Sequence, residues 1–408
     1  MSPYVIVIAD DLTGAADTGA SFATQGAETL VVWAEDQWPT ADVLVHSTES
    51  RHLDREMAIR KVGSVVEWLK ISVPHPERCW IYKKIDSTLR GNPGPELAAL
   101  IQGLAIESAL VAPAFPSQGR TTRTGQLFVE GVSLTDTIFG REVASSDVQS
   151  LLRTALPQKR FGLLPLDLVR QGGAGVAMRQ VGIWVADAET EDDLTLLARA
   201  AQESETRLLC GSAGLARALA AMLVTGSDRP LPSYEAIQPV SGGQGVLVVA
   251  ASRHPQTLAQ IACAAAAGIR IICPEPQWFA DDTHPADLSD ALIEGLTQGA
   301  VVLTTAGLPE LPTAGKRLVT RLAQAVSALG REQPPKAMVL TGGDAAIAVG
   351  QALEASALRL RGELLPGVPW GTLVGGAFPG LPVVTKAGGF GNEDTLLMAI
   401  RFLNSQGE

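Results

Sequence analysis

The sequence predicts an α/β protein with two domains, each a mostly parallel sheet flanked by helices. Short runs rich in β-branched residues alternate with longer amphipathic or alanine-rich stretches, which is the order that βαβ units produce. The alternation stops once, at residues 225–245, in a segment rich in Pro, Gly and Ser, and then restarts. We expect the active site in the cleft between the domains, where two-domain α/β enzymes commonly bind small molecules.

The composition is that of a well-buried globular protein. The 408 residues favour two or three domains, and 46% are hydrophobic against 18% charged, far from the disordered class. The formal net charge is −11 and no basic block occurs, so general nucleic-acid binding is not expected. An anionic substrate stays compatible, because a local basic pocket can lie on an acidic surface.

Several features of the chain favour a cytoplasmic protein. None of the four cysteines forms a C-x-x-C pair, and all lie in apolar stretches typical of buried reduced thiols. The opening residues, MSPYVIVIADD, lack the cationic start and cleavage site of a secretory leader. The apolar runs are shorter than a membrane span, so no membrane partner is expected. A homodimer formed through a sheet edge or an apolar helix stays open.

The first predicted domain, residues 1–230, contains most of the alternating segments. Its strands are bounded by turn residues, and its helices show apolar residues at helical spacing. We expect strands at 4–9, 42–47, 79–85, 108–114, 182–188 and 207–211, and helices at 54–70, 93–104 and 192–203. Functional loops in such a sheet lie at the carboxyl ends of the strands.

Asp10 and Asp11 directly follow the first strand, and Thr13-Gly14 then leads into a helix. At least one carboxylate is expected to face the cleft. There it can accept hydrogen bonds from sugar hydroxyls, act as a general base or hold Mg²⁺. The alternative is a helix N-cap, which explains one aspartate but not two. Asp17 is interpreted as structural.

The segment YKKIDSTLRGNPGPEL, residues 82–96, combines cations and hydroxyls at the end of a strand. Lys84 and Asp86 project to one side of the strand, and Ser87 and Arg90 follow in the loop. Arginine suits a planar carboxylate because its fork can bind both oxygens. The pattern favours an anion site over a solvated loop with an internal Lys–Asp pair.

Two further loops of this domain leave their alternatives open. Arg120 and Arg123, in a hairpin-like segment at 112–131, can either meet an anion or belong to an ordinary surface hairpin. Gly211 and Gly214, in CGSAG, precede a helix. They can expose backbone N–H groups to an anion, or they can serve helix–strand packing alone.

The second predicted domain, residues 231–408, repeats the strand–loop–helix order. Strands are expected at 245–252, 268–273, 300–307, 337–344 and 381–389. Glycine pairs after a strand let a phosphate approach the backbone closely, and two such pairs with a serine loop favour nucleotide binding. The residues concerned are Ser252, Gly342, Gly343, Asp344, Gly388 and Gly389.

Three other features of these loops bear on nucleotide chemistry. Lys386 can neutralise phosphate charge. Asp344 would repel a bare phosphate, so it caps the helix, meets a ribose hydroxyl or holds Mg²⁺. His254 is the one histidine in these loops, and the histidine spacing does not suit zinc. Neither a P-loop nor a dinucleotide fingerprint is present.

Seven motifs together resemble the four-carbon acid sugar kinases, a family long catalogued as a domain of unknown function. They are IADDLTGAADTG, KKIDSTLRGN, APAFPSQGRTTRTGQ, GSAGLA, TGGD, LPGVPWG and KAGGFGNEDTL, in the family's order and over nearly the whole chain. The chain has Ala250-Ala251-Ser252 where the family commonly has Ser-Gly-Ser, and Ala345 where it commonly has Thr.

The resemblance implies an N-terminal acid-sugar-binding domain, a C-terminal nucleotide-binding domain and ATP-dependent phosphorylation of a terminal hydroxyl. The acceptor would be threonate, erythronate or a 3-oxo-tetronate. By resemblance, ATP would contact Ser252, Gly342-Gly343-Asp344 and Gly388-Gly389.

The mechanism predicted for such a kinase is positional and electrostatic. Asp10 or Asp11, with Asp11 preferred, would orient or deprotonate the hydroxyl. Arg90, Lys84 and Ser87 would hold the substrate carboxylate, and Mg²⁺ with Lys386 would neutralise the transferring phosphoryl group.

Two rival functions remain at this point. One is a magnesium-dependent sugar-acid lyase or dehydratase that uses the same carboxylates. The other is a sensor that binds a sugar acid or nucleotide without turnover.

Overall fold

The computed structural model describes residues 4–33, 40–143, 145–225, 242–276, 278, 286–308, 315–329 and 333–405. The chain forms two compact units. The first comprises Met1–Thr29 and Pro39–Leu231, and the second comprises Leu30–Trp38 and Pro232–Glu408. The predicted boundary between residues 230 and 231 lies outside the described residues. Residues 30–33 group with the second unit, which the sequence did not indicate.

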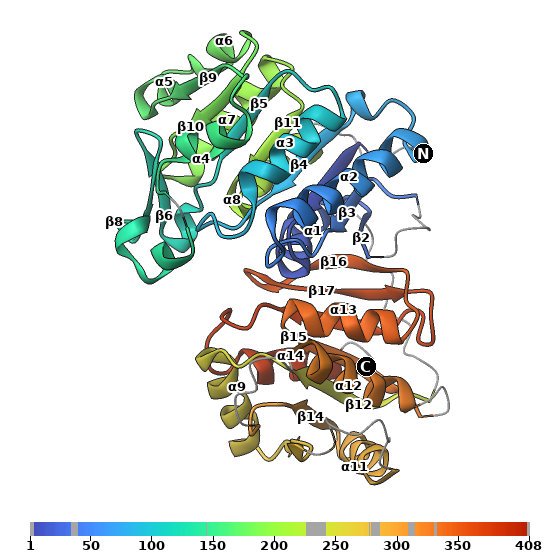
Figure 1. The fold of residues 1–408 in the computed structure, drawn as a ribbon. Coiled ribbons are helices and arrows are strands. Elements are labelled where there is room, and N and C mark those ends of the chain that lie inside the picture. Colours follow the sequence, from blue (N-terminus) through green and yellow to red (C-terminus); the bar gives the residue numbers. More distant parts are fainter. Residues whose placement is uncertain are drawn as a thin grey trace. The chain divides into compact units, whose positions relative to one another are not determined.

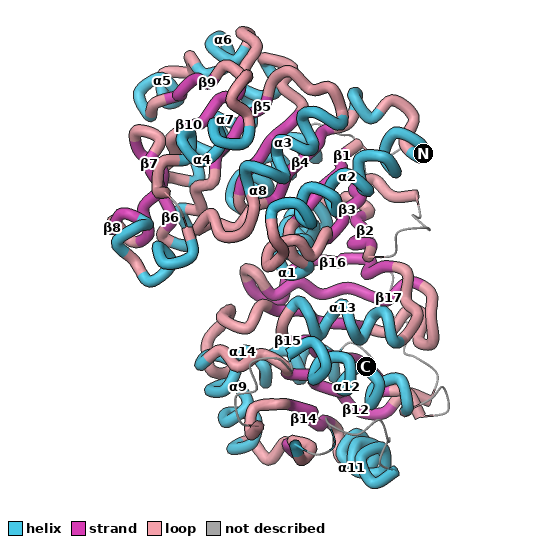
Figure 2. The backbone as a smooth tube through the Cα atoms, viewed as in Figure 1, coloured by secondary structure: helices cyan, strands magenta, loops and turns pink. Residues whose placement is uncertain are grey.

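The first unit is a parallel sheet flanked by helices (Figures 1 and 2). Its strand order is β3-β1-β4-β11-β5-β10-β9, and the neighbouring strands run parallel. A separate antiparallel sheet has the order β6-β7-β8. The elements are β1 (Val5–Ala9), α1 (Leu12–Thr24), β3 (Val43–Ser47), α2 (Arg55–Ser72), η1 (Pro76–Arg78), β4 (Trp80–Lys84), α3 (Pro93–Gly103), β5 (Ala109–Ala112), η2 (Pro116–Gln118), β6 (Arg120–Arg123), β7 (Gln126–Val129), β8 (Val132–Ser133), η3 (Leu134–Asp136), η4 (Ile138–Glu142), α4 (Val148–Ala155), β9 (Phe161–Leu164), α5 (Leu166–Arg170), α6 (Ala174–Met178), β10 (Ile183–Ala186), α7 (Glu191–Glu203), β11 (Leu208–Gly211) and α8 (Ala213–Thr225).

The second unit has the strand order β13-β14-β12-β15-β18-β17-β16-β2. β13, β14, β12, β15 and β18 are parallel, whereas β17 runs antiparallel to both β18 and β16. The elements are β2 (Thr29–Val32), β12 (Gln244–Ala250), α9 (Pro255–Ala266), β13 (Arg270–Ile272), α11 (Ala286–Thr297), β14 (Ala300–Thr304), α12 (Gly315–Ala328), β15 (Pro335–Thr341), α13 (Gly343–Ala352), β16 (Ala357–Leu365), β17 (Val368–Val374), β18 (Pro382–Lys386) and α14 (Thr395–Ser405).

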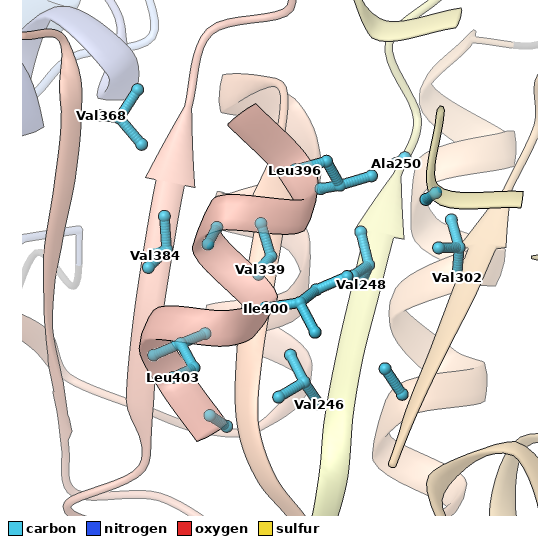
Figure 3. Close-up of a cluster of buried hydrophobic side chains, with 14 of the residues drawn as sticks. Val246, Val248, Ala250, Val302, Val339, Val368, Val384, Leu396, Ile400 and Leu403 are labelled. Atoms are coloured by element: carbon cyan, nitrogen blue, oxygen red, sulfur yellow. The ribbon is translucent and has the colours of Figure 1, made fainter. Parts of the chain in front are cut away.

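A buried apolar cluster fixes α14 on the sheet of the second unit (Figure 3). Leu396, Ile400 and Leu403 recur at helical spacing on one face of α14. They pack with valines of the strands, among them Val248 and Val339. Because α14 follows the loop after β18 directly, this packing also anchors that loop.

Trp33, just after β2, supports α13 in the second unit. Its Nε1 donates to the carbonyl of Ala355 at 2.7 Å. A Cβ at Gly350 of α13 would lie 2.7 Å from the indole Cζ2, so glycine is required there by close approach.

In each unit the strand register aligns the loops that carry the predicted site residues. Ala9 of β1 pairs with Ser47 and with Lys84, so the ends of β1, β3 and β4 meet at one edge. Thr341 of β15 pairs with Ala250 and Lys386, which aligns the ends of β12, β15 and β18 in the same way. The fold class is confirmed. Among the described residues, no helix has the length and apolarity needed to cross a membrane.

Candidate active site

Arg51 binds both aspartates that end the first strand. Its guanidinium donates to the two oxygens of Asp10 at 2.8 Å each and to those of Asp11 at 2.7 and 2.8 Å. Arg51 lies in the loop after β3, beside the end of β1. Asp11 is also the N-cap of α1, accepting from Gly14 N at 3.0 Å and from the Thr13 hydroxyl at 2.5 Å. The cap explains one aspartate, and Arg51 explains why two are adjacent.

The charges in this cluster stabilise one another. Burial by itself would raise the pKa of Asp10, but the charge and hydrogen bonds of Arg51, together with the charges of Lys83 and Lys84, outweigh burial, and the pKa lies below its usual value. Burial would lower the pKa of Arg51, and the two carboxylates instead raise it. Asp10 and Arg51 are therefore charged at neutral pH, and Asp10 is a hydrogen-bond acceptor rather than a strong base.

A buried ion pair between Lys83 and Glu96 holds the loop that contains Arg51. Lys83 Nζ lies 2.7 Å from Glu96 Oε2, and both side chains are almost fully buried. The other oxygen of Glu96 accepts from the hydroxyl of Ser50 at 2.7 Å. Ser50 precedes Arg51, so α3 and β4 together fix the loop from which Arg51 reaches the aspartates.

Asp86 joins the cluster through two arginines. Arg90 donates to both of its oxygens, at 3.2 and 2.8 Å, and Arg51 NH1 lies 3.7 Å away. Burial would raise the pKa of Asp86, but its hydrogen bond from Arg90 and the charge of Arg51 hold it well below the usual value. Ser87 is half-buried in the same turn. The loop therefore contains an internal ion pair, but it is Arg90–Asp86 and not the Lys–Asp pair of the alternative interpretation.

Lys84 forms no ion pair with a described acidic side chain, although its charge acts on the carboxylates of Asp10 and Asp17. Its ammonium donates to the carbonyl of Ile85 at 3.0 Å, and its side chain is buried. A Cβ at Gly14 would lie 2.9 Å from Lys84 Nζ and 2.5 Å from Asp11 Oδ1. The glycine in DDLTG therefore makes room for both groups at the start of α1.

The structure does not link Arg120 to this cluster by any contact between described residues. The Arg120 side chain donates to the carbonyl of Gln118, and its Nε is buried without an acceptor. Its guanidinium lies 5.8 Å from the ring centre of Phe139. Arg123 pairs with Glu189.

Two other predicted positions are structural in their contacts. Asp17 lies 3.4 Å from Arg217 of α8, and burial raises its pKa despite that arginine. In CGSAG, a Cβ at Gly211 would lie 2.5 Å from the Ala112 carbonyl, and one at Gly214 would lie 3.0 Å from the Ala114 carbonyl. Both glycines therefore serve close packing.

In the second unit, the turn after β18 packs against side chains of α9 and of the residues just before it. Phe390 N donates to the Ala387 carbonyl at 3.2 Å, which makes Gly388 and Gly389 the centre of a β-turn. A Cβ at Gly388 would overlap Ser252 Oγ. The amides of both glycines donate to nothing among the described contacts, so the turn offers two free donors.

Two residues of α9 hold this turn in place. Thr257 donates its hydroxyl proton to the Gly388 carbonyl at 2.7 Å. Gln260 Nε2 donates to the carbonyls of Phe390 and Asn392 at 3.0 and 2.8 Å. Because the turn's carbonyls are bound to α9, its N–H groups stay available to a ligand.

The loop after β15 presents the start of a helix. Gly342 has φ +99°, a conformation that favours glycine, and it caps α13 without a side chain. Its own amide donates to the Lys386 carbonyl at 2.9 Å. The first N–H groups of α13 are therefore uncovered, as an anion site requires. Asp344 is exposed in the first turn, and Ala345 is buried.

Lys386 ends β18 and is 1% exposed. Its Nζ donates to the Ala387 carbonyl at 2.9 Å, and it has no acidic partner among the described residues. Burial lowers the pKa of Lys386 to about 8. A buried ammonium with one hydrogen bond is a strong candidate for an anionic ligand.

Sequence reasoning missed Arg51, Glu96, Thr257 and Gln260. Arg51 had a partial signal, because it is the first cation after the expected strand at 42–47, but the pairing of that strand with β1 is known only from the structure. The other three lie inside helices, where nothing in the sequence separates them from ordinary polar positions.

Two family models match the chain. One is described as a sugar-binding N-terminal domain and matches residues 5–219. The other is described as a nucleotide-binding C-terminal domain and matches residues 247–396.

Curated relatives match over nearly the whole chain. A D-threonate kinase of Cupriavidus necator is 37% identical over 96% of both chains, and one of Salmonella typhimurium is 34% identical over 98% of both. Relatives at 26–30% identity are named D-erythronate kinase and 3-oxo-tetronate kinase.

A solved structure from Salmonella typhimurium, described as a putative tRNA synthase, shares the fold. Its TM-score is 0.78 at 23% identity, and the match covers 99% of this chain and 100% of that one.

Proposed function

The chain belongs to the four-carbon acid sugar kinase family, a family of phosphotransferases with an alcohol acceptor, and from this premise we propose that it transfers the terminal phosphoryl group of ATP to the terminal hydroxyl of a four-carbon acid sugar. The acid sugar would bind to the first unit and ATP to the second. The magnesium-dependent lyase and the non-catalytic sensor lose their support, because the curated relatives named above are kinases.

One observation supports this division of ligands most directly. Each unit has a buried lysine at the carboxyl end of a strand, and neither ammonium forms an ion pair with a described acidic side chain, although Asp10 and Asp17 act on Lys84 through their charge. Burying a charge without a partner is costly, so each lysine favours an anion as its ligand. The proposed substrates supply two anions, a sugar-acid carboxylate for Lys84 and a phosphate for Lys386.

In the first unit, we assign the substrate carboxylate to Lys84, with Arg90 and Ser87 at its side. Arg90 already donates to both oxygens of Asp86. It would therefore keep this ion pair and act on the substrate carboxylate through its charge. Asp11 would accept the terminal hydroxyl. Its oxygens already accept four hydrogen bonds, and the neutral donor Thr13 is the one whose hydroxyl can rotate away.

In the second unit, the free amides of Gly388 and Gly389, the start of α13 and the Ser252 hydroxyl would bind the phosphates of ATP. Mg²⁺ would neutralise phosphate charge. The described residues hold no cluster of three metal-ligating side chains, which suits a Mg²⁺ that arrives with the nucleotide and keeps most of its waters. Asp344, exposed in the first turn of α13, would be the carboxylate that contacts it.

The chemistry assigned to these residues is positioning and charge stabilisation. Phosphoryl transfer needs the acceptor oxygen in line with the phosphorus and the charge on the equatorial oxygens compensated. Asp10 and Asp11, held by Arg51, would fix the hydroxyl. Lys386 and the glycine amides would stabilise the phosphoryl oxygens.

The test is ATP-dependent product formation with a panel of acids: D-threonate, D-erythronate and a 3-oxo-tetronate. We expect stoichiometric ADP release and a phosphorylated acid, with D-threonate preferred, since the relatives at 34–37% identity carry that name. If ADP appears with none of the acids, or if the acid is consumed without ATP, the proposal is wrong.

The role of Asp11 is tested by Asp11→Asn, which keeps an N-cap acceptor but removes the charge. We expect kcat to fall by about 10², the range for losing a group that assists proton transfer or orients the hydroxyl. Asp147→Ala, which removes the N-cap of α4, is the matched control and should change stability alone. Unchanged turnover in a folded Asp11→Asn variant would remove Asp11 from the mechanism.

A further inference from the structure

His254 lies where its imidazole can serve two purposes. It is the N-cap of α9, and its Nδ1 accepts from Gln256 N at 3.1 Å. An imidazole nitrogen that accepts a hydrogen bond carries no proton, so in the neutral ring the proton is on Nε2. The cap therefore fixes the tautomer and leaves a donor at the far edge of the ring.

The donor edge of His254 faces the glycine turn after β18. A Cβ at Gly389 would lie 3.1 Å from His254 Nε2, closer than from the ring carbons. A Cβ at Gly388 would lie 3.3 Å from His254 Cβ and would overlap Ser252 Oγ. The imidazole is exposed and rests beside the two free amides of this turn.

The Ser252 hydroxyl has a matching arrangement. Its oxygen accepts from His254 N at 3.3 Å, and its own proton has no acceptor among the described contacts. Ser252 and His254 thus bring two side-chain donors beside a turn whose two glycine amides have no acceptor among the described contacts.

We propose that His254 is a further ligand of the nucleotide phosphates, donating Nε2–H to a phosphoryl oxygen at the Gly388–Gly389 turn. This inference rests on the proposed kinase function.

The experiment separates phosphate binding from helix capping. Asparagine and serine are good N-caps but do not reach to the Nε2 position, so His254→Asn and His254→Ser keep the cap and lose the donor. His254→Ala loses both. His75→Asn is the matched control, because His75 lies in the first unit with φ +57°, which asparagine tolerates.

Calorimetry measures the binding of three ligands: inorganic triphosphate, a non-hydrolysable ATP analogue with Mg²⁺, and adenosine. The Tm of each variant measures its stability. We expect His254→Asn and His254→Ser to weaken triphosphate and the ATP analogue about tenfold, the effect of one hydrogen bond to a charged group. Adenosine affinity, acid-sugar KM and Tm should stay unchanged, and only His254→Ala should lower Tm.

Two outcomes would overturn the inference in distinguishable ways. If the wild type binds the ATP analogue and His254→Asn binds it within twofold, His254 is a cap only and the kinase function stands. If the wild type binds neither triphosphate nor the ATP analogue, the nucleotide site and the role of His254 both fall.

Discussion

At the scale of single residues, Arg51 organises the acceptor half of the candidate site. One guanidinium binds both Asp10 and Asp11 and lies near Asp86, so three carboxylates depend on its planar fork. Lysine offers the same charge but cannot bind two carboxylates in this geometry. The site therefore needs an arginine at this position, and not simply a positive charge.

Arg51→Ala should destabilise the protein by about 3–5 kcal/mol, because it leaves the buried carboxylate of Asp10 without its ion pair. Arg51→Lys should recover part of this stability while kcat/KM for the acid sugar stays at least tenfold low. Urea unfolding and steady-state kinetics measure the two effects. Arg55→Lys, at the exposed start of α2, is the control. Full activity in Arg51→Lys would show that charge alone suffices.

Lys386 gives the nucleotide site a distinctive pH dependence. Burial lowers its pKa from 10.5 to about 8, so the free protein loses this cation as pH rises through about 8. Nucleotide affinity should then fall by up to about tenfold per pH unit above 8. Between pH 8 and 10.5 the unfolded chain binds the proton more tightly, so Lys386 makes the free energy of unfolding rise over the same interval.

These opposite slopes are measured by calorimetric titration of an ATP analogue and by urea unfolding from pH 7 to 10. Lys386→Met should weaken binding at pH 7 and flatten both slopes, whereas the exposed Lys70→Met should leave both unchanged. A nucleotide affinity that is constant from pH 7 to 9.5 in the wild type would contradict the assignment.

A site residue could be predicted from the sequence where its position depends only on its neighbours along the chain, and not where it depends on tertiary packing. Asp10 directly follows a strand, Lys84 and Lys386 are the last residues of theirs, and a strand end can be predicted from an apolar run. The role of Arg51 depends on which strand pairs with β1, and a single sequence does not give the strand order of a sheet. Thr257 and Gln260 depend on how α9 is rotated against the turn after β18.

At the scale of elements, two helical or turn glycines leave room for functional side chains. Gly14 lies beneath Asp11 and Lys84, and Gly388 lies beneath Ser252 and His254. Neither has a positive φ, so each glycine is required by crowding rather than by backbone conformation.

Gly14→Ala should raise the acid-sugar KM, and Gly388→Ala should raise the nucleotide Kd, each by about tenfold or more, because the added methyl displaces a ligand-binding group. Gly63→Ala in α2 is the matched control, since a Cβ there meets nothing within 4 Å. It should stabilise the protein by about 0.5–1 kcal/mol through helix propensity. If all three variants behave alike, crowding at the two sites is unimportant.

The expected strands of both parallel sheets are present because continuous apolar runs bounded by Gly, Asp and Ser are strong signals. The β16–β17 hairpin was not predicted, although its turn contains the LPGVPWG motif. Gly367 in this turn is required both by its backbone and by packing. It has φ +76°, and a Cβ there would overlap the ring of Phe390 in the loop after β18.

At the scale of the whole molecule, each proposed ligand has its contacts within one unit. The effects of substitutions in the two units on ligand binding should therefore be independent. Lys386→Met should change the Kd of the ATP analogue but not that of the acid sugar. Gly14→Ala should change the Kd of the acid sugar but not that of the ATP analogue. In the double variant the two losses should add within about 0.5 kcal/mol, as for separate sites. Titration of each ligand alone measures this, and a larger deviation would indicate that the units are energetically coupled.

The cleft between the units, the cytoplasmic location and a homodimer stay predictions. Turnover requires the acceptor hydroxyl and the phosphoryl group of ATP to meet, and a cleft that closes over them would also exclude water. Light scattering at enzyme concentrations used for kinetics tests the dimer.

The contact between Trp33 and α13 limits how this gene can be divided. A fragment cloned from residue 232 onward would lack the indole that fills the gap left by Gly350 and the strand that pairs with β16. A chimera that takes its C-terminal region from a relative would likewise separate that region from the residue that occupies the position of Trp33 in the same relative. Chimeras should therefore carry residues 30–33 along with the region they accompany.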